Sequence, residues 1–151
     1  MKVEIEVNSV LKQTQVVIQT PQIDAQVQQI AQNLQELSVS REKLLFYQGD
    51  REYYLAVQEI LFFETFARQV QAHTGEQAYQ TRLHLYQLEE LLPSTFMRVS
   101  KSTILNLQAI YSLEHTMGQT RITFQNTPKE VFVSRKYYQQ VRQYLTGGES
   151  L

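Results

Sequence analysis

Two segments of the sequence gather side chains that could bind an anion, and the first is FMRVSKSTILNL (96–107). Within it, Arg98 and Lys101 are interspersed with the hydroxyl groups of Ser100 and Ser102. Guanidinium, ammonium and hydroxyl donors are the groups that hold phosphate oxygens in nucleic acid complexes. The same side chains could instead form the solvated face of a strand, and the residue types alone leave both interpretations open.

The second segment is VSRKY (133–137). Ser134 is the expected N-cap of a final helix, which puts Arg135 and Lys136 in its first turn. Unpaired backbone N–H groups and the helix dipole favour an anion at that position. The alternative is that these residues only cap the helix and solvate strand ends.

No set of residues in the sequence is arranged for catalysis. There is no cysteine, and His73, His84 and His115 lack the spacing typical of metal ligands. The five glycines form no phosphate-binding loop, and Glu89 and Glu90 are adjacent on a predicted helix, so their carboxylates point apart. We therefore expect a protein that is not an enzyme and uses no cofactor, metal or small-molecule substrate.

The composition is that of a packed domain of ordinary size. The chain has 151 residues, of which 42% are hydrophobic and 11% aromatic. No apolar run approaches the roughly 20 residues of a membrane span, and the N-terminus shows no signal-peptide core. Together with the absence of cysteine, this favours a cytoplasmic protein.

The charge changes sign along the chain. Residues 1–97 hold seven Lys/Arg and twelve Asp/Glu, a net charge of −5. Residues 98–142 hold seven Lys/Arg and only two Asp/Glu, a net charge of +5. An excess of positive charge in the half that carries both candidate segments is a hint of a polyanionic partner.

Residues 1–42 are expected to form a small β-β-α unit. Residues 1–10 alternate charged and apolar side chains, residues 14–20 are rich in β-branched residues, and apolar residues recur at helical spacing from Ile23 to Leu37. A polar linker (38–42) follows. We expect this unit to support dimerisation or to complete the fold.

Residues 43–146 are expected to be mainly β, and the residues after them to form a flexible tail (147–151). A hairpin is predicted around Gln48-Gly49-Asp50. Strands are predicted at 60–65, 70–73, 79–85, 96–102, 109–114, 120–125 and 130–133, and helices at 86–94 and 134–145. The aliphatic ILNL segment (104–107) is interpreted as a turn and a buried helix.

Three elements of this region resemble the LytTR family of DNA-binding domains from bacterial transcriptional regulators. The family pattern Phe-x-Arg-x-His-Arg-Ser-x-Ile-Val-Asn is similar to FMRVSKSTILN (96–106), which Ile110 follows at the family spacing. ILFFET (60–65) and VSRKY (133–137) resemble the flanking family elements. The resemblance covers residues 43–146, about two thirds of the chain.

The resemblance implies an α+β, mainly β fold, an elongated β-sheet domain with short helices. It further implies a transcriptional regulator that binds double-stranded DNA sequence-specifically, with loops rather than a recognition helix in successive major grooves, as a homodimer on paired sites. Carried over by position, the DNA-binding residues are Arg68, Arg98, Ser100, Lys101, Ser102, Arg135 and Lys136. A protein-interaction module that binds an acidic partner through the same basic loops is the alternative.

Two departures from the family bear on mechanism. The family's His-Arg is Ser100-Lys101 here, which keeps a positive charge but loses the guanidinium fork that reads guanine. The leader of roughly 40 residues is too short for a receiver domain, and Asp24 has no acidic cluster around it, so phosphorelay control is not expected. The resemblance suggests a small membrane protein as a regulatory partner instead.

Overall fold

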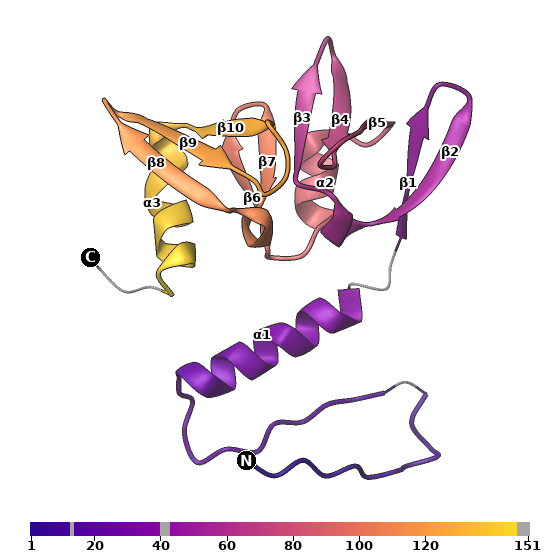
Figure 1. The fold of residues 1–151 in the computed structure, drawn as a ribbon. Helices are drawn as coiled ribbons and strands as arrows, with labels where there is room; N and C mark the ends of the chain where they lie inside the picture. The colour runs from indigo at the N-terminus through magenta and orange to yellow at the C-terminus, as the bar shows by residue number, and fades with distance from the viewer. Residues whose placement is uncertain (13, 40–42, 148–151) are drawn as a thin grey trace. The chain divides into compact units, whose positions relative to one another are not determined.

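The computed structural model describes residues 1–12, 14–39 and 43–147, and the chain divides into two compact units, Met1–Gln35 and Glu36–Leu151 (Figure 1). Each unit is described by itself. No helix within the described ranges is long and apolar enough to cross a membrane. The predicted linker residues 40–42 and most of the predicted tail (148–151) lie outside the described residues.

The N-terminal part of the chain contains the predicted helix but neither predicted strand. Helix α1 (Ala25–Val39) begins after Asp24, whose Oδ1 accepts a hydrogen bond of 2.9 Å from the Val27 N–H, as an N-cap does. Residues 1–12 and 14–24 are assigned to no strand, so the β-β part of the prediction is wrong. The alternating apolar side chains find no sheet to pack on, since Ile5 is 87% exposed, and an isolated two-stranded hairpin is marginal in water.

The described residues of the second unit form ten strands in two antiparallel sheets. The larger sheet has the order β2-β1-β5-β4-β3-β7-β6, and the smaller has the order β10-β9-β8. The larger sheet is built from β1 (Lys43–Gln48), β2 (Arg51–Ala56), β3 (Phe62–Phe66), β4 (Gln69–His73), β5 (Ala78–Thr81), β6 (Phe96–Ser100) and β7 (Thr103–Asn106). The smaller sheet is built from β8 (Ser112–Thr116), β9 (Gln119–Thr123) and β10 (Glu130–Val133). The mainly β prediction is therefore confirmed.

Two helices complete this unit. Helix α2 (Leu85–Leu91) buries Leu85 and Leu88 and ends before Pro93, as the sequence predicts. Helix α3 (Arg135–Leu145) begins after Ser134 and packs the buried Val141 beside β6 and β9. Gly147, at φ +66°, follows its end in the left-handed conformation common after helices.

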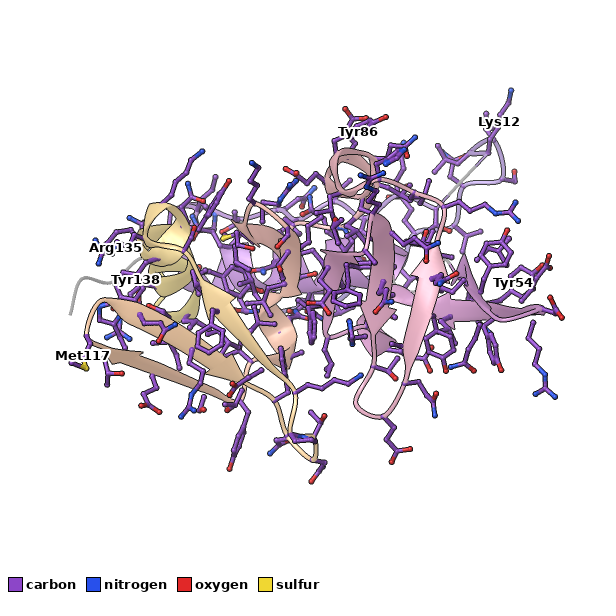
Figure 2. All side chains as sticks on the ribbon, turned by 90° about the horizontal axis from the view of Figure 1, so that it is seen from above. Lys12, Tyr54, Tyr86, Met117, Arg135 and Tyr138 are labelled. Atoms are coloured by element: carbon purple, nitrogen blue, oxygen red, sulfur yellow. The ribbon has the colours of Figure 1, made fainter. Side chains whose placement is uncertain are left out.

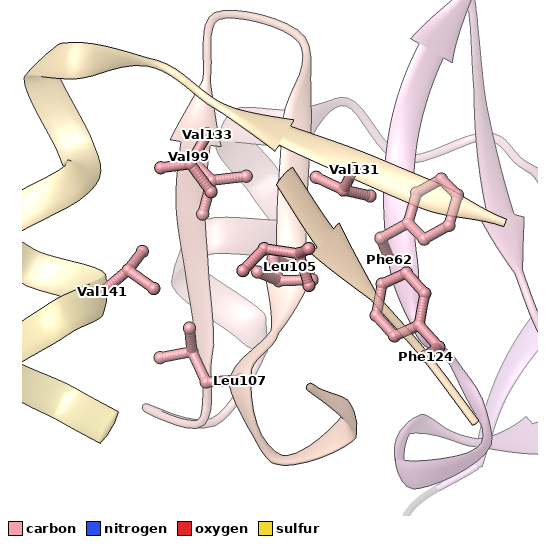
Figure 3. Packing of buried hydrophobic residues seen from close by; sticks show 9 residues of the cluster. Phe62, Val99, Leu105, Leu107, Phe124, Val131, Val133 and Val141 are labelled. Atoms are coloured by element: carbon pink, nitrogen blue, oxygen red, sulfur yellow. The ribbon is translucent and has the colours of Figure 1, made fainter. Parts of the chain in front are cut away.

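The paired strands β3 and β7 are buried on both faces of the larger sheet at Phe62–Phe63 and along Thr103–Asn106. Phe62 and Leu105 lie in one core, which the smaller sheet and α3 cover (Figure 3). Phe63 and Ile104, their neighbours in the chain, lie in a second core against α2. A strand covered on both faces has no polar face, which explains why apolar residues stand next to each other at Phe62-Phe63 and Ile104-Leu105.

That burial corrects the interpretation of the ILNL segment. Its first three residues belong to strand β7, and all four residues of β7 are buried. A short 3-10 turn (Leu107–Ala109) follows, and the Asn106 side chain accepts a hydrogen bond of 3.1 Å from the Gln108 N–H at its start. A buried strand and a buried helix share the same apolar pattern over a few residues, which is why the sequence did not separate them.

Candidate nucleic-acid interface

Two backbone hydrogen bonds hold three elements together at one end of the strands of the larger sheet. Each of these elements, the β3–β4 turn, the β6–β7 turn and the start of α3, carries a cationic side chain. The Thr65 N–H donates to the Ser102 carbonyl at 2.9 Å, which fixes the β6–β7 turn beside the end of β3. The Ser134 N–H donates to the Val99 carbonyl at 2.8 Å, which fixes the start of α3 beside the end of β6. The β3–β4 turn, the β6–β7 turn and the start of α3 accordingly lie along the upper edge in Figure 1.

Arg68 occupies the two-residue turn between β3 and β4. Ala67 and Arg68 have φ of +51° and +65°, the left-handed values at both positions that a tight type I′ hairpin requires. These values are uncommon for residues other than glycine and cluster at functional sites. Phe66, beside the turn, is 65% exposed. The turn therefore presents an arginine and an aromatic ring to solvent.

Lys101 and Ser102 form the turn between β6 and β7, and both are exposed. The register shifts between Arg98 and Ser100, so a β-bulge directly precedes the turn. The Ser102 N–H donates to Ser100 Oγ at 3.3 Å, which closes the turn on itself. Bulges of this kind redirect the side chains next to them, here the lysine.

The Arg98 side chain, unlike that of Lys101, makes several contacts within the domain. Its Nε donates to the Ser100 carbonyl at 3.0 Å, and its terminal nitrogens contact the Lys101 carbonyl and the Glu89 carboxylate of α2. The side chain is only 24% exposed. Arg98 therefore holds the bulge and the turn in place through its hydrogen bonds, and its positive charge is paired with the Glu89 carboxylate.

Arg135 and Lys136 stand in the first turn of α3, and both are exposed. Lys136 Nζ lies 5.4 Å from the centroid of the Tyr137 ring, a cation–π contact. The Ser134 hydroxyl makes no capping hydrogen bond. In the part of the chain that the structure describes, no carboxylate lies within ion-pair distance of Arg68, Lys101, Arg135 or Lys136.

An open groove of about 480 Å³ joins two of the three elements. Ser100 and Ser102 line one side, and Ser134 and Arg135 line another. The remaining lining comes from Glu64, Thr103, Gly118, Gln119 and Glu130–Val133. The predicted residues of the β6–β7 turn and of α3 therefore share one surface, whereas Arg98 lies outside this groove.

A polar cluster beside this edge joins the two sheets. His73 Nε2 is buried and lies 2.8 Å from Glu64 Oε1, and His73 Nδ1 lies 3.2 Å from Lys129 Nζ. An ammonium can only donate, so Nδ1 accepts and the ring proton sits on Nε2, facing the carboxylate. Burial lowers the pKa of His73; the Glu64 carboxylate opposes this shift and the Lys129 ammonium adds to it.

Several of these partners were not predicted from the sequence. They are Glu89, which holds Arg98, the set Glu64, His73 and Lys129, and Gly118, which lines the groove beside Arg135. A turn is predictable at Met117-Gly118-Gln119 from the glycine, but its contact with α3 leaves no local signal. Each partner lies far along the chain or on another element, where neither spacing nor periodicity applies.

The family model of the LytTr DNA-binding domain matches residues 50–146. The chain belongs to the LytTr family. The match contains both sheets except β1, together with α2, α3 and all three cation-bearing elements. Family membership assigns the chain to DNA-binding proteins rather than to enzymes.

Curated relatives extend the likeness beyond the LytTr domain. An uncharacterized HTH-type transcriptional regulator of Staphylococcus aureus (strain MSSA476) is 26% identical over 146 residues, 97% of this chain and 99% of that protein. Another from strain MRSA252 is 30% identical over 113 residues, 75% of this chain and 76% of that protein. The relatives are named HTH-type, but in this chain α2 and α3 are separated by strands β6 to β10.

A solved structure agrees with the fold. The LytTr DNA-binding domain from Bacillus cereus superposes with a TM-score of 0.64 at 20% identity, and the match covers 70% of this chain and 97% of that one. At this identity the likeness concerns the fold. The arrangement of sheets and short helices is therefore that of a LytTr domain.

Proposed function

We propose that this LytTr protein binds double-stranded DNA sequence-specifically as a cytoplasmic transcriptional regulator. The β3–β4 turn, the β6–β7 turn and the first turn of α3 enter major grooves, and the protein binds paired sites as a homodimer. The observation that carries the proposal is that these three elements lie at the same end of the strands of the larger sheet. Three separate elements present cations without carboxylate partners among the described residues, and backbone hydrogen bonds hold these elements side by side.

The seven predicted site residues divide into two roles under this proposal. Arg68, Lys101 and Arg135 contact DNA from the three elements, and Lys136, Ser100 and Ser102 add donors to the phosphate backbone. Arg98 acts indirectly, because its guanidinium is held by the Glu89 carboxylate and by two turn carbonyls. It shapes the turn that carries Lys101.

The proposed homodimer and the membrane-protein regulator concern the N-terminal part. Deletion of residues 1–38, with mass measured in solution, tests whether this part drives dimerisation. A truncated chain that stays as oligomeric as the parent would exclude that role. Co-expression with a candidate small membrane protein, followed by measurement of promoter activity, tests the proposed regulatory partner.

A competition assay tests the central claim. Duplexes selected from a random-sequence pool should compete for the protein at least roughly 10³-fold better than a scrambled duplex of equal length. Equal competition by selected and scrambled duplexes at moderate salt would reject sequence-specific recognition. Binding of an acidic polypeptide in preference to either duplex would favour the protein-interaction alternative.

Matched arginine variants locate the surface. Arg135→Ala should weaken DNA binding by about 1–3 kcal/mol if it reads a base, or uniformly across sequences with a smaller salt slope if it contacts a phosphate. Arg142→Ala is the control, because Arg142 lies in the last turn of the same helix. Equal effects of the two variants would show that α3 does not approach DNA by its first turn.

A further inference from the structure

The β8–β9 turn carries a glycine directly against Arg135. Met117 and Gly118 form this two-residue turn, at φ of +53° and +77°. A Cβ added to Gly118 would lie 3.0 Å from Arg135 Nη2 and 3.7 Å from both Cζ and Nε. The guanidinium of Arg135 therefore lies so close to Gly118 that it would have to shift by a few tenths of an ångström to make room for a side chain there.

The turn is itself fixed to the helix that carries Arg135. The His115 ring of β8 stacks on the Tyr138 ring of α3, with centroids 4.4 Å apart and planes at 22°. His115 Nδ1 also lies 2.6 Å from Thr120 Oγ1 on β9. Arg135 and Tyr138 are three positions apart and share one face of α3, and Figure 2 shows both beside Met117 at the tip of the turn.

We propose that Gly118 is a positioning residue for DNA recognition, because its bare Cα lets the β8–β9 turn hold the Arg135 guanidinium in one orientation. The inference rests on the proposed function of Arg135. An arginine that is held before binding loses less conformational freedom when it meets a base or phosphate. Gly118 thus contributes to affinity and base preference without touching DNA.

The nature of the contact determines what a substitution does. The atom that a Cβ would press on is the far end of a flexible side chain, so Arg135 yields and the fold does not. The positive φ of Gly118 adds a backbone cost for any other residue. Gly49, at φ +60° in the β1–β2 turn, has the same backbone requirement, but a Cβ there meets nothing within 4 Å.

The test compares Gly118→Ala with Gly49→Ala in the full chain. Both should lower the melting temperature by similar amounts, because both place alanine at positive φ. Only Gly118→Ala should weaken binding to the duplex selected from a random-sequence pool, by roughly five- to tenfold, while binding to a scrambled duplex changes less. Gly118→Asn and Gly49→Asn repeat the comparison with a residue that tolerates positive φ.

A double variant separates this inference from the proposed function. If Gly118 acts through Arg135, adding Gly118→Ala to Arg135→Ala should weaken binding no further. Additive losses, or equal losses from the Gly118 and Gly49 variants, would overturn the positioning role. If Arg135→Ala alone leaves binding unchanged, the proposed site at α3 fails, and the inference fails with it.

Discussion

Lys129 Nζ lies 3.2 Å from His73 Nδ1, and this contact joins the loop between β9 and β10 to the larger sheet. The same ammonium donates to the carbonyls of Thr74 and Gln77 at 2.9 and 2.8 Å. Thr127 Oγ1 adds a bond of 2.8 Å to the Gly75 carbonyl. The docking of one sheet on the other is therefore polar at this end and apolar in the core.

We expect Lys129→Met to lower the free energy of unfolding by about 1–3 kcal/mol, because two charge-assisted contacts with half-buried acceptors and one with an exposed carbonyl are lost. Urea titration followed by circular dichroism measures the change. Lys43→Met is the control, since Lys43 is exposed on β1. A loss no greater than that of the control would mean that the lysine is not a structural contact.

Stability should depend on pH through His73. Because burial lowers its pKa in the folded state, the unfolded chain binds a proton more readily, and stability falls as pH drops below about 6.5 toward that lowered value. Above pH 6.5 the contribution of His73 to folding stability is fully present. Below that pH, the free energy of unfolding can change by at most about 1.4 kcal/mol per pH unit for one proton. Denaturant midpoints between pH 5 and 8 test this.

His73→Gln provides the control for that titration. The variant should flatten the profile between pH 5 and 6.5, because it removes the His73 imidazole whose pKa is lowered in the folded state. An unchanged profile would place the pH dependence on groups other than the Glu64–His73–Lys129 cluster.

Arg98 should contribute to stability and Lys101 should not. Arg98→Met removes a half-buried guanidinium that contacts Glu89 and two turn carbonyls, and we expect a loss of about 1–3 kcal/mol. Lys101→Met should stay within about 0.5 kcal/mol of the parent. A double-mutant cycle of Arg98→Met with Glu89→Gln measures the pair, and a coupling energy near zero would contradict the bracing role.

Lys101→Arg should sharpen base discrimination. The substitution restores the planar guanidinium that can pair bidentately with guanine, a contact worth about 1–3 kcal/mol against the wrong base. Selection from a random duplex pool with each protein, followed by comparison of the selected sequences, measures it. Identical preferences would show that position 101 contacts the phosphate backbone only.

The hairpins β1–β2, β8–β9 and β9–β10 could be predicted because their turns carry local signals, whereas the strand predicted at 79–85 is too long, since β5 ends at Thr81 and Leu85 begins α2. Gln48-Gly49-Asp50 predicts the first hairpin, and Gly118 and Pro128 mark the turns between the last three strands. The ILNL segment could not be assigned, since burial on both faces removes the alternation that distinguishes a strand. The alternation at Val3, Ile5 and Val7 predicted a strand that the structure does not contain, because these exposed side chains have no surface to pack against.

The residues of the candidate site follow from motif spacing, and their contacts with DNA stay a prediction. Motif spacing selects Arg98 and Lys101 alike, yet the structure separates them, since only Arg98 reaches the Glu89 carboxylate. The capping interpretation of Ser134 holds for its backbone position, while its hydroxyl makes no capping bond. Such distinctions depend on which elements pack together, and sequence spacing does not encode that packing.

The alternation of Phe62 and Phe63 between two cores has a consequence for how the LytTr domain unfolds. Consecutive side chains of β3, and likewise Ile104 and Leu105 of β7, belong to opposite cores. Neither core can melt while the other survives, because the two share strands β3 and β7. The domain should therefore unfold as one cooperative unit, and a single-residue insertion before Phe62 would turn the β3 side chains of each core toward the other core.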